Sequence, residues 1–207
     1  MNLRENKIVN KNNIVNKNNI VTMSIIGINI ILYIITAIMS KNILDINAYV
    51  LLYMGGNYGA LVSHGQVWRL LTCAFLHGGL IHILCNMYAL YALGPQVEIL
   101  FGRVKYIIIY FFSAIGGSLL SYKFSPSSLS IGASGAIFGL FGAMVVFVLK
   151  YKDRIPKKVL NNLFGVIILN LLIGFNLQGI DNFAHIGGLL VGALVAFLFL
   201  MQKTKNA

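Results

Sequence analysis

Apolar runs of membrane-spanning length dominate the chain from residue 21 onward. Six such runs alternate with polar or basic stretches, at about 21–40, 80–100, 105–122, 132–150, 157–175 and 182–202. A helix rises about 1.5 Å per residue, so each run is long enough to cross about 30 Å of hydrocarbon. The pattern therefore predicts an all-α membrane protein built as a bundle of six transmembrane helices.

Two tails flank this predicted bundle. Residues 1–20 are rich in Asn and Lys and repeat I-V-N-K-N-N at 8–13 and 14–19. Polar sequence of such low complexity buries no core, so we expect a disordered N-terminal tail. A short basic C-terminal tail is expected at 203–207, which leaves residues 21–202 for the helical domain.

The connection between the first two runs, residues 41–79, has an unusual composition. It is semi-apolar and contains glycines at 55, 56, 59 and 65. A plain solvated loop is neither so long nor so apolar, so we expect this segment to lie in the membrane interface or against the helices. Trp68 and Arg69 suit the interface, with the indole at the headgroups and the guanidinium reaching phosphate.

Composition and charge placement narrow the class further. The chain is 58% hydrophobic and 10% charged, too few charges to cover a soluble surface of this size. Its net charge of +11 would suit a nucleic-acid-binding protein, but the basic residues lie between apolar runs instead of along one helix face. The N-terminal tail, the connections after the second and fourth runs, and the C-terminal tail carry four, two, five and two of them, 13 of 16. Because basic flanks stay cytoplasmic, this distribution predicts cytoplasmic N- and C-termini and no nucleic-acid partner.

A serine opens the fourth apolar run. Ser134 lies in G-A-S-G, where the start of a helix offers unpaired N–H groups that suit a developing oxyanion. Polar groups inside a membrane are costly and mark functional candidates. A packing role is the alternative, because Gly135, Gly139 and Ala143 form a ladder of small residues at four-residue spacing. Ser134 is a candidate nucleophile on this basis.

His185 lies near the start of the sixth run beside a similar ladder. Ala184, Gly188 and Gly192 recur every four residues, which is typical of close helix contact. A histidine next to such a seam can reach the neighbouring helix and act as a base at neutral pH. The alternative is a structural, hydrogen-bonded histidine. Asp181, four residues earlier, is either a third catalytic residue or a helix N-cap, and we favour the cap.

Two further polar residues share one face of the second helix. His82 and Asn86 are four residues apart, and both side chains can donate hydrogen bonds. Together they could stabilise an oxyanion from the wall opposite the serine. The alternative is an interhelical polar clamp that contributes about 1 kcal/mol.

In this order, these residues resemble the rhomboid family of intramembrane serine proteases. The motifs are W-R at 68–69, H-G-G-L-I-H-I-L-C-N at 77–86, G-A-S-G-A-I-F-G at 132–139 and A-H-I-G-G-L-L-V-G at 184–192. The resemblance implies a six-helix rhomboid-like protease domain over residues 21–202. It also implies a serine endopeptidase that cleaves single-pass transmembrane proteins within or next to the bilayer. Its active-site cavity would face the extracytoplasmic side of a cell membrane.

The resemblance further implies roles for individual residues. Ser134 and His185 would form the catalytic dyad, and the Ser134 N–H, His82 and Asn86 would hold the oxyanion. Supporting roles would fall to Gly132, Phe138, His77, Trp68, Arg69 and Glu98. Many members have a tyrosine that stacks on the catalytic histidine where this chain has Phe138. Phenylalanine would keep the packing and lose one hydrogen bond.

Three other functions fit the sequence less well. A metalloprotease would need H-E-x-x-H or a comparable cluster, which the sequence lacks, so no metal or other cofactor is expected. A channel or transporter would carry inverted repeats or rings of charge. A catalytically silent rhomboid-like protein that binds membrane clients is the alternative, but such proteins typically lack the serine or the histidine.

Overall fold

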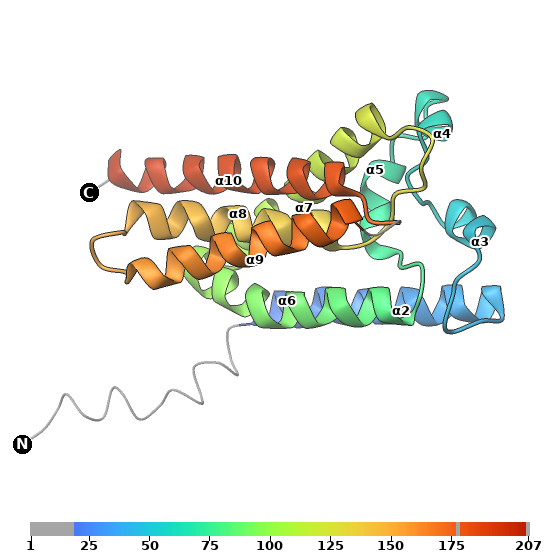
Figure 1. Ribbon diagram of the computed structural model, residues 1–207, viewed down its shortest axis with the longest axis horizontal. Helices are drawn as coiled ribbons and strands as arrows, with labels where there is room; N and C mark the ends of the chain where they lie inside the picture. The colour runs from blue at the N-terminus through green and yellow to red at the C-terminus, as the bar shows by residue number, and fades with distance from the viewer. Residues whose placement is uncertain (1–18, 177–178, 206–207) are drawn as a thin grey trace, which may run out of the picture.

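The computed structural model describes residues 19–176 and 179–205, and six long helices account for most of them (Figure 1). They are α2 (Ile20–Ser40), α6 (Leu80–Phe101), α7 (Arg103–Phe124), α8 (Ser134–Lys150), α9 (Lys157–Asn176) and α10 (Asn182–Lys205). Each begins and ends within three residues of the apolar run that predicted it. The expected N-terminal tail lies almost wholly outside the described residues, and the last residues of α10 overlap the expected C-terminal tail.

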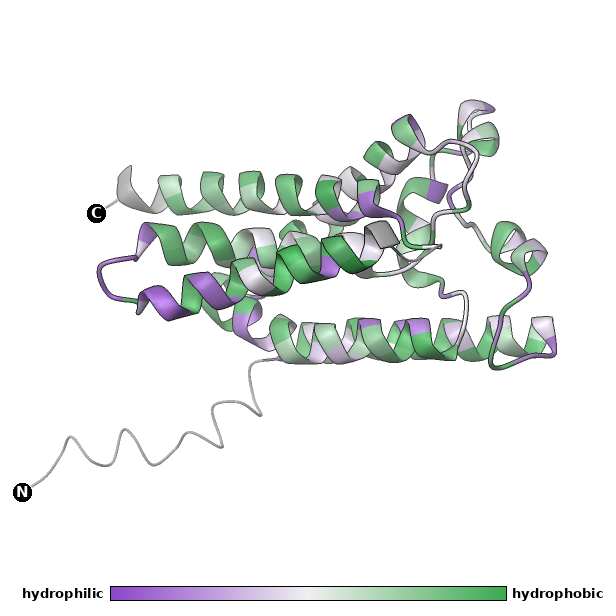
Figure 2. Cartoon of the chain, viewed as in Figure 1, coloured by the Kyte–Doolittle hydropathy of each residue, from purple (hydrophilic) through white to green (hydrophobic). Residues whose placement is uncertain are grey.

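In α2, polar side chains are found on the face toward the inside of the bundle, whereas large apolar side chains cover the outer face. In α2, Thr22, Asn29 and Thr36 recur every seven residues on the buried face. On the outer face Ile31 and Ile38 are 59% and 71% exposed. Apolar positions, drawn in green, predominate along the long helices in Figure 2. A helix facing water has the reverse distribution, so these exposed isoleucines indicate a lipid-facing surface.

Length and composition identify the membrane-spanning candidates. Within the described residues, five helices are long and apolar enough to cross a membrane, namely α2, α6, α7, α9 and α10. Helix α8 is equally apolar but has 17 residues, because the chain before Ser134 forms a turn instead of a further helical turn. The protein is therefore a multi-pass membrane protein. The start of α2, the end of α10 and the α8–α9 turn lie together at one end of the bundle (Figure 1).

Helices α8 and α10 meet backbone to backbone. A Cβ added to Gly188 would lie 1.9 Å from the Gly135 carbonyl oxygen, and one on Gly192 would lie 2.2 Å from the Gly139 carbonyl oxygen. Such close approach is possible only where neither helix carries a side chain at the contact. The small-residue ladders that the sequence indicated on the two helices thus pack against each other and bring the starts of α8 and α10 together.

The connection 41–79 is folded and lies at the opposite end of the bundle from the start of α2 and the end of α10 (Figure 1). It contains α3 (Ala48–Tyr53), α4 (Gly59–Ser63), α5 (Arg69–Thr72) and the 3₁₀ turn η2 (Cys73–Phe75). Arg69 is buried, and its guanidinium donates to the carbonyl oxygens of Leu52 at 2.6 Å and Gly56 at 2.9 Å. The prediction that Arg69 reaches lipid phosphate is therefore wrong, because the side chain is buried and its Nε and Nη1 donate inside the connection. The Trp68 ring stays half exposed, with its centroid 4.7 Å from the guanidinium carbon.

Candidate active site

Ser134 is the first residue of α8, and a glycine turns the chain into that helix. Gly132 has a φ of +115°, a conformation that side chains strongly disfavour. Its N–H donates to the Cys73 carbonyl oxygen at 2.9 Å, which fixes the turn to the 41–79 connection. Ser134 is partly buried, and the first N–H groups of a helix have no partner within it. The turn thus places a hydroxyl group beside free N–H donors.

His82 and Asn86 of α6 lie against this turn. A Cβ added to Gly132 would lie 2.7 Å from His82 Nε2 and 3.8 Å from Asn86 Nδ2. His82 Nδ1 accepts a hydrogen bond from the Gly78 N–H at 3.4 Å, which places the hydrogen of a neutral ring on Nε2, the nitrogen that faces Gly132. Asn86 Nδ2 donates to the His82 carbonyl oxygen at 3.0 Å and has a second N–H to offer. Both candidate oxyanion donors therefore lie at the Ser134 turn.

The His185 ring stacks on Phe138 of α8. The ring centroids are 4.2 Å apart and the planes make an angle of 7°, so the expected packing of Phe138 on this histidine is present. Ser134 and Phe138 are four residues apart, so the His185 ring lies on the side of α8 that carries the serine. His185 is buried, and its Nδ1 has no hydrogen-bond partner in the described part of the chain. Nor does a hydrogen bond join Ser134 to His185 among those residues.

Asp181 caps α10. Its Oδ1 accepts a hydrogen bond from the Ala184 N–H at 3.0 Å, three residues along, and its carbonyl oxygen accepts one from the His185 N–H at 3.2 Å. This is the N-cap arrangement, so the prediction of a cap is confirmed. The carboxylate fixes the helical turn that carries His185.

A set of contacts that the sequence did not predict holds the loop before α8. Asn57 and Ser130 exchange backbone hydrogen bonds of 3.1 and 2.9 Å, and Asn57 Nδ2 donates to the Ser118 carbonyl oxygen of α7 at 3.0 Å. Cys73 Sγ lies 3.1 Å from Ser118 Oγ. Burial raises the pKa of the Cys73 thiol to about 11, so the thiol stays protonated at neutral pH. We call Asn57, Cys73, Ser118 and Ser130 the loop clamp.

The sequence held only a weak sign of this clamp. Asn57 is a polar residue among the glycines of a connection too apolar to be solvated, which is the one signal that could have suggested a buried role. Nothing local in the sequence links Cys73 to Ser118, which lies 45 residues further along the chain. Contacts between residues this far apart in the chain depend on the tertiary fold.

With this geometry established, comparison with known proteins assigns the family. Residues 64–202 match the family model described as "Rhomboid domain". The chain belongs to the rhomboid family. RHOMBOID-like protein 1 of Arabidopsis thaliana is 43% identical over 152 residues, covering 72% of this chain and 39% of that protein. Rhomboid protease GluP of Bacillus subtilis is 39% identical over 150 residues, covering 72% of this chain and 29% of that protein.

A third rhomboid relative extends the match. Rhomboid-like protease 1 of Toxoplasma gondii is 37% identical over 175 residues, covering 82% of this chain and 60% of that protein. The chain thus spans between 29% and 60% of the length of these three relatives.

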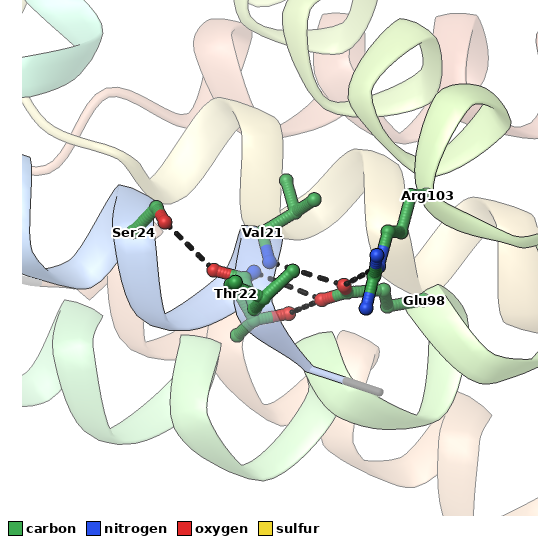
Figure 3. Close-up of polar contacts among 6 residues, drawn as sticks. Val21, Thr22, Ser24, Glu98 and Arg103 are labelled. Atoms are coloured by element: carbon green, nitrogen blue, oxygen red, sulfur yellow. Dashed lines mark hydrogen bonds and ion pairs between the residues drawn. The ribbon is translucent and has the colours of Figure 1, made fainter. Parts of the chain in front are cut away.

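Glu98 stabilises the rhomboid bundle at the end away from Ser134. Its carboxylate is buried and accepts hydrogen bonds from the Val21 N–H at 3.1 Å, the Thr22 N–H at 2.9 Å and the Thr22 hydroxyl at 2.7 Å (Figure 3). Arg103 Nε lies 4.0 Å from the same carboxylate. The negative charge therefore caps the start of α2, where the helix dipole favours an anion, and ties α6 to α2.

His77 packs behind His82 in the connection that precedes α6. The two rings are edge to face, with centroids 5.1 Å apart and an interplanar angle of 70°. His77 is fully buried, and neither ring nitrogen has a partner in the described residues. Burial, and secondarily His82, lowers the pKa of His77 to about 3, so the ring is neutral at physiological pH. No group of three or more His, Cys, Asp or Glu among the described residues is placed to hold a metal ion.

Proposed function

We propose that this chain is an intramembrane serine endopeptidase that cleaves single-pass transmembrane proteins within or next to the bilayer. One observation carries the proposal: the helix start at Ser134 has His82 and Asn86 against its Gly132 turn, while the His185 ring lies on the same side of α8. A nucleophile, a base and oxyanion donors are the groups that acyl transfer requires. Membership of the rhomboid family supports the same reaction class.

The first half of the proposed reaction forms an acyl-enzyme. His185 accepts the proton of the Ser134 hydroxyl while Oγ bonds to the carbonyl carbon of the scissile peptide. The Ser134 N–H, His82 Nε2–H and Asn86 Nδ2–H would donate to the resulting oxyanion. One such donor typically contributes about 10²–10³ in rate. His185 then returns the proton to the leaving amine as the C–N bond breaks.

The second half consumes water. His185 deprotonates a water molecule, whose oxygen attacks the ester carbon on Ser134. The ester bond breaks, the new carboxyl product leaves, and Ser134 regains its proton from His185. Because this step needs water at membrane depth, the proposal includes a water-filled cavity open to the extracytoplasmic side.

We also propose that the chain crosses the cell membrane six times and that both termini lie in the cytoplasm. The basic residues support this topology, since 13 of 16 lie in the N-terminal tail, at the connections after α6 and α8, and in the C-terminal tail. Helix α8 is shorter than a hydrocarbon core of about 30 Å, since 17 residues reach about 26 Å. With Lys150 at the cytoplasmic interface, Ser134 would lie just below the outer boundary, where water can reach it.

The test compares wild type, Ser134→Ala and Ser127→Ala in detergent with a single-pass transmembrane substrate. Ser127 is an exposed serine of the loop before α8 and serves as the matched control. Mass spectrometry should find cleavage in or beside the membrane segment for wild type and Ser127→Ala, and none for Ser134→Ala. If no protein cuts several substrates and a fluorophosphonate probe leaves Ser134 unlabelled, a silent client-binding rhomboid becomes the better interpretation.

A further inference from the structure

An apolar groove lies between α6, α8 and α9, at the end of the bundle away from Ser134. It has a volume of about 320 Å³ and is lined chiefly by Ile99, Leu100, Met144, Val148, Ile155 and Val159. Met144 and Val148 are buried and form its floor, whereas Ile99 and Leu100 are 46% and 40% exposed. The groove is therefore open to the outside along the last turns of α6.

Basic residues adjoin the groove lining in sequence, on the linker between α8 and α9 and at the start of α9. The exposed basic residues of the linker and the first turn of α9 are Lys152, Arg154, Lys157 and Lys158. Arg154 precedes the lining residue Ile155, and Lys158 precedes the lining residue Val159. None of the four has an ion-pair partner among the described residues. An apolar groove and a cluster of unpaired cations thus meet at one place.

We propose that this groove binds one anionic phospholipid, with an acyl chain on the apolar floor and the phosphate among the linker cations. The chemistry of the two halves matches that of such a lipid, since basic sites between transmembrane helices attract anionic headgroups. A transmembrane helix fits less well. At about 10 Å across, less than one helical turn would fill 320 Å³. A single hydrocarbon chain is narrower and can follow the groove.

The proposed lipid site is separate from the proposed catalytic site. Met144 and Val148, which line the groove, follow Ser134 on α8 by 10 and 14 residues, or about 15 and 21 Å at about 1.5 Å per residue. Lipid binding can therefore be measured without any cleavage assay, and its failure would leave the proposed protease function untouched.

The test is lipid retention measured by native mass spectrometry. Full-length protein in neutral detergent is mixed with equal amounts of phosphatidylglycerol and phosphatidylcholine that carry the same acyl chains. We expect one phosphatidylglycerol to be retained in preference to phosphatidylcholine. Arg154→Gln/Lys158→Gln should weaken phosphatidylglycerol binding about 25-fold, since each cation near the headgroup contributes about a fivefold factor. The control Lys41→Asn/Lys123→Gln removes two exposed cations elsewhere and should leave binding unchanged.

A second variant tests the groove itself. Val159→Trp places an indole at a position 39% exposed, so the fold tolerates it while the groove is filled. It should abolish phosphatidylglycerol retention although every cation remains. Equal retention of the two lipids by wild type, an equal loss in the Lys41→Asn/Lys123→Gln control, or full retention by Val159→Trp would each overturn the proposal.

Discussion

The imidazole of His82 occupies the space that a side chain at position 132 would need. A Cβ on Gly132 would lie 2.7 Å from His82 Nε2 and 2.9 Å from His82 Cε1. This contact joins α6 to the loop that carries Ser134. Glycine is therefore required at 132 for two reasons, the positive φ and the histidine ring.

Gly132→Ala should lower catalysis more than its strain alone explains. Gly65 offers a matched control, because its φ is +92° and a Cβ there would meet nothing within 4 Å. Both alanines carry about 1–2 kcal/mol of backbone strain. Only the alanine at 132 displaces His82, so kcat should fall about 10²-fold in Gly132→Ala and stay near wild type in Gly65→Ala. Equal kcat values in the two variants would count against a role for His82 in the oxyanion site.

Gly188→Ala should destabilise the bundle, while Gly165→Ala should not. A Cβ at 188 would lie 1.9 Å from the Gly135 carbonyl oxygen, whereas a Cβ at 165 would meet nothing within 4 Å. Overpacking costs about 1–3 kcal/mol, and replacing an unhindered helical glycine by alanine gains up to about 1 kcal/mol. Thermal unfolding in detergent should shift the midpoint down for the first variant and up for the second. A midpoint that rises in both would mean that α8 and α10 can separate freely.

Asn57→Ala should slow the reaction with little change in KM, because the loop clamp positions the turn before Ser134 and contacts no substrate in the proposed mechanism. Asn47→Ala is the control, since Asn47 caps α3 through a 2.9 Å bond to the Tyr49 N–H and is exposed. Both variants lose stability of about 1 kcal/mol. The rate of fluorophosphonate labelling of Ser134 should fall with kcat in Asn57→Ala alone. Similar labelling rates for the two variants would reduce Asn57 to a purely structural residue.

Glu98→Gln should weaken the tie between α2 and α6. The carboxylate accepts three hydrogen bonds from Val21 and Thr22. In glutamine one of the two oxygens is replaced by an NH₂ group, which cannot accept the hydrogen bonds made to that oxygen. A buried donor left without an acceptor costs about 1–3 kcal/mol. Asp153→Asn removes an exposed charge and should leave the unfolding midpoint unchanged. If Glu98→Gln unfolds at the wild-type temperature, as Asp153→Asn should, the proposed role of Glu98 in joining α2 to α6 is wrong.

His77 should make the folded protein sensitive to acid. Burial holds its pKa at about 3 in the folded chain, against about 6.5 when it is exposed. Between these values the unfolded chain binds one more proton, so stability rises with pH and is lost as pH falls below about 6.5. Between pH 7.5 and 5.0 the loss should be about 2 kcal/mol. Denaturant unfolding of His77→Gln should lack this part of the pH dependence, and identical slopes for the two proteins would contradict the assignment.

Most helix positions were predictable because they depend on local sequence. An apolar run indicates that its segment lies in lipid, and whether a segment lies in lipid depends on that segment's own composition. The cap at Asp181 was predictable for the same reason, since its partner Ala184 is three residues away. The prediction for Arg69 was wrong because it used only the neighbouring residues, and a basic residue next to Trp68 is typical of the membrane interface. Its actual acceptors belong to Leu52 and Gly56, which only folding of the connection brings near.

The sequence by itself determined the helical membrane architecture, the family and the candidate residues of the site, because hydropathy, small-residue spacing and short motifs are local properties. Only the tertiary structure decided how those residues meet: the His82 ring against Gly132, the His185 ring on Phe138, and the loop clamp through Asn57. These contacts join segments far apart in the chain. Their geometry follows from how closely the helix backbones can approach, which no single segment specifies.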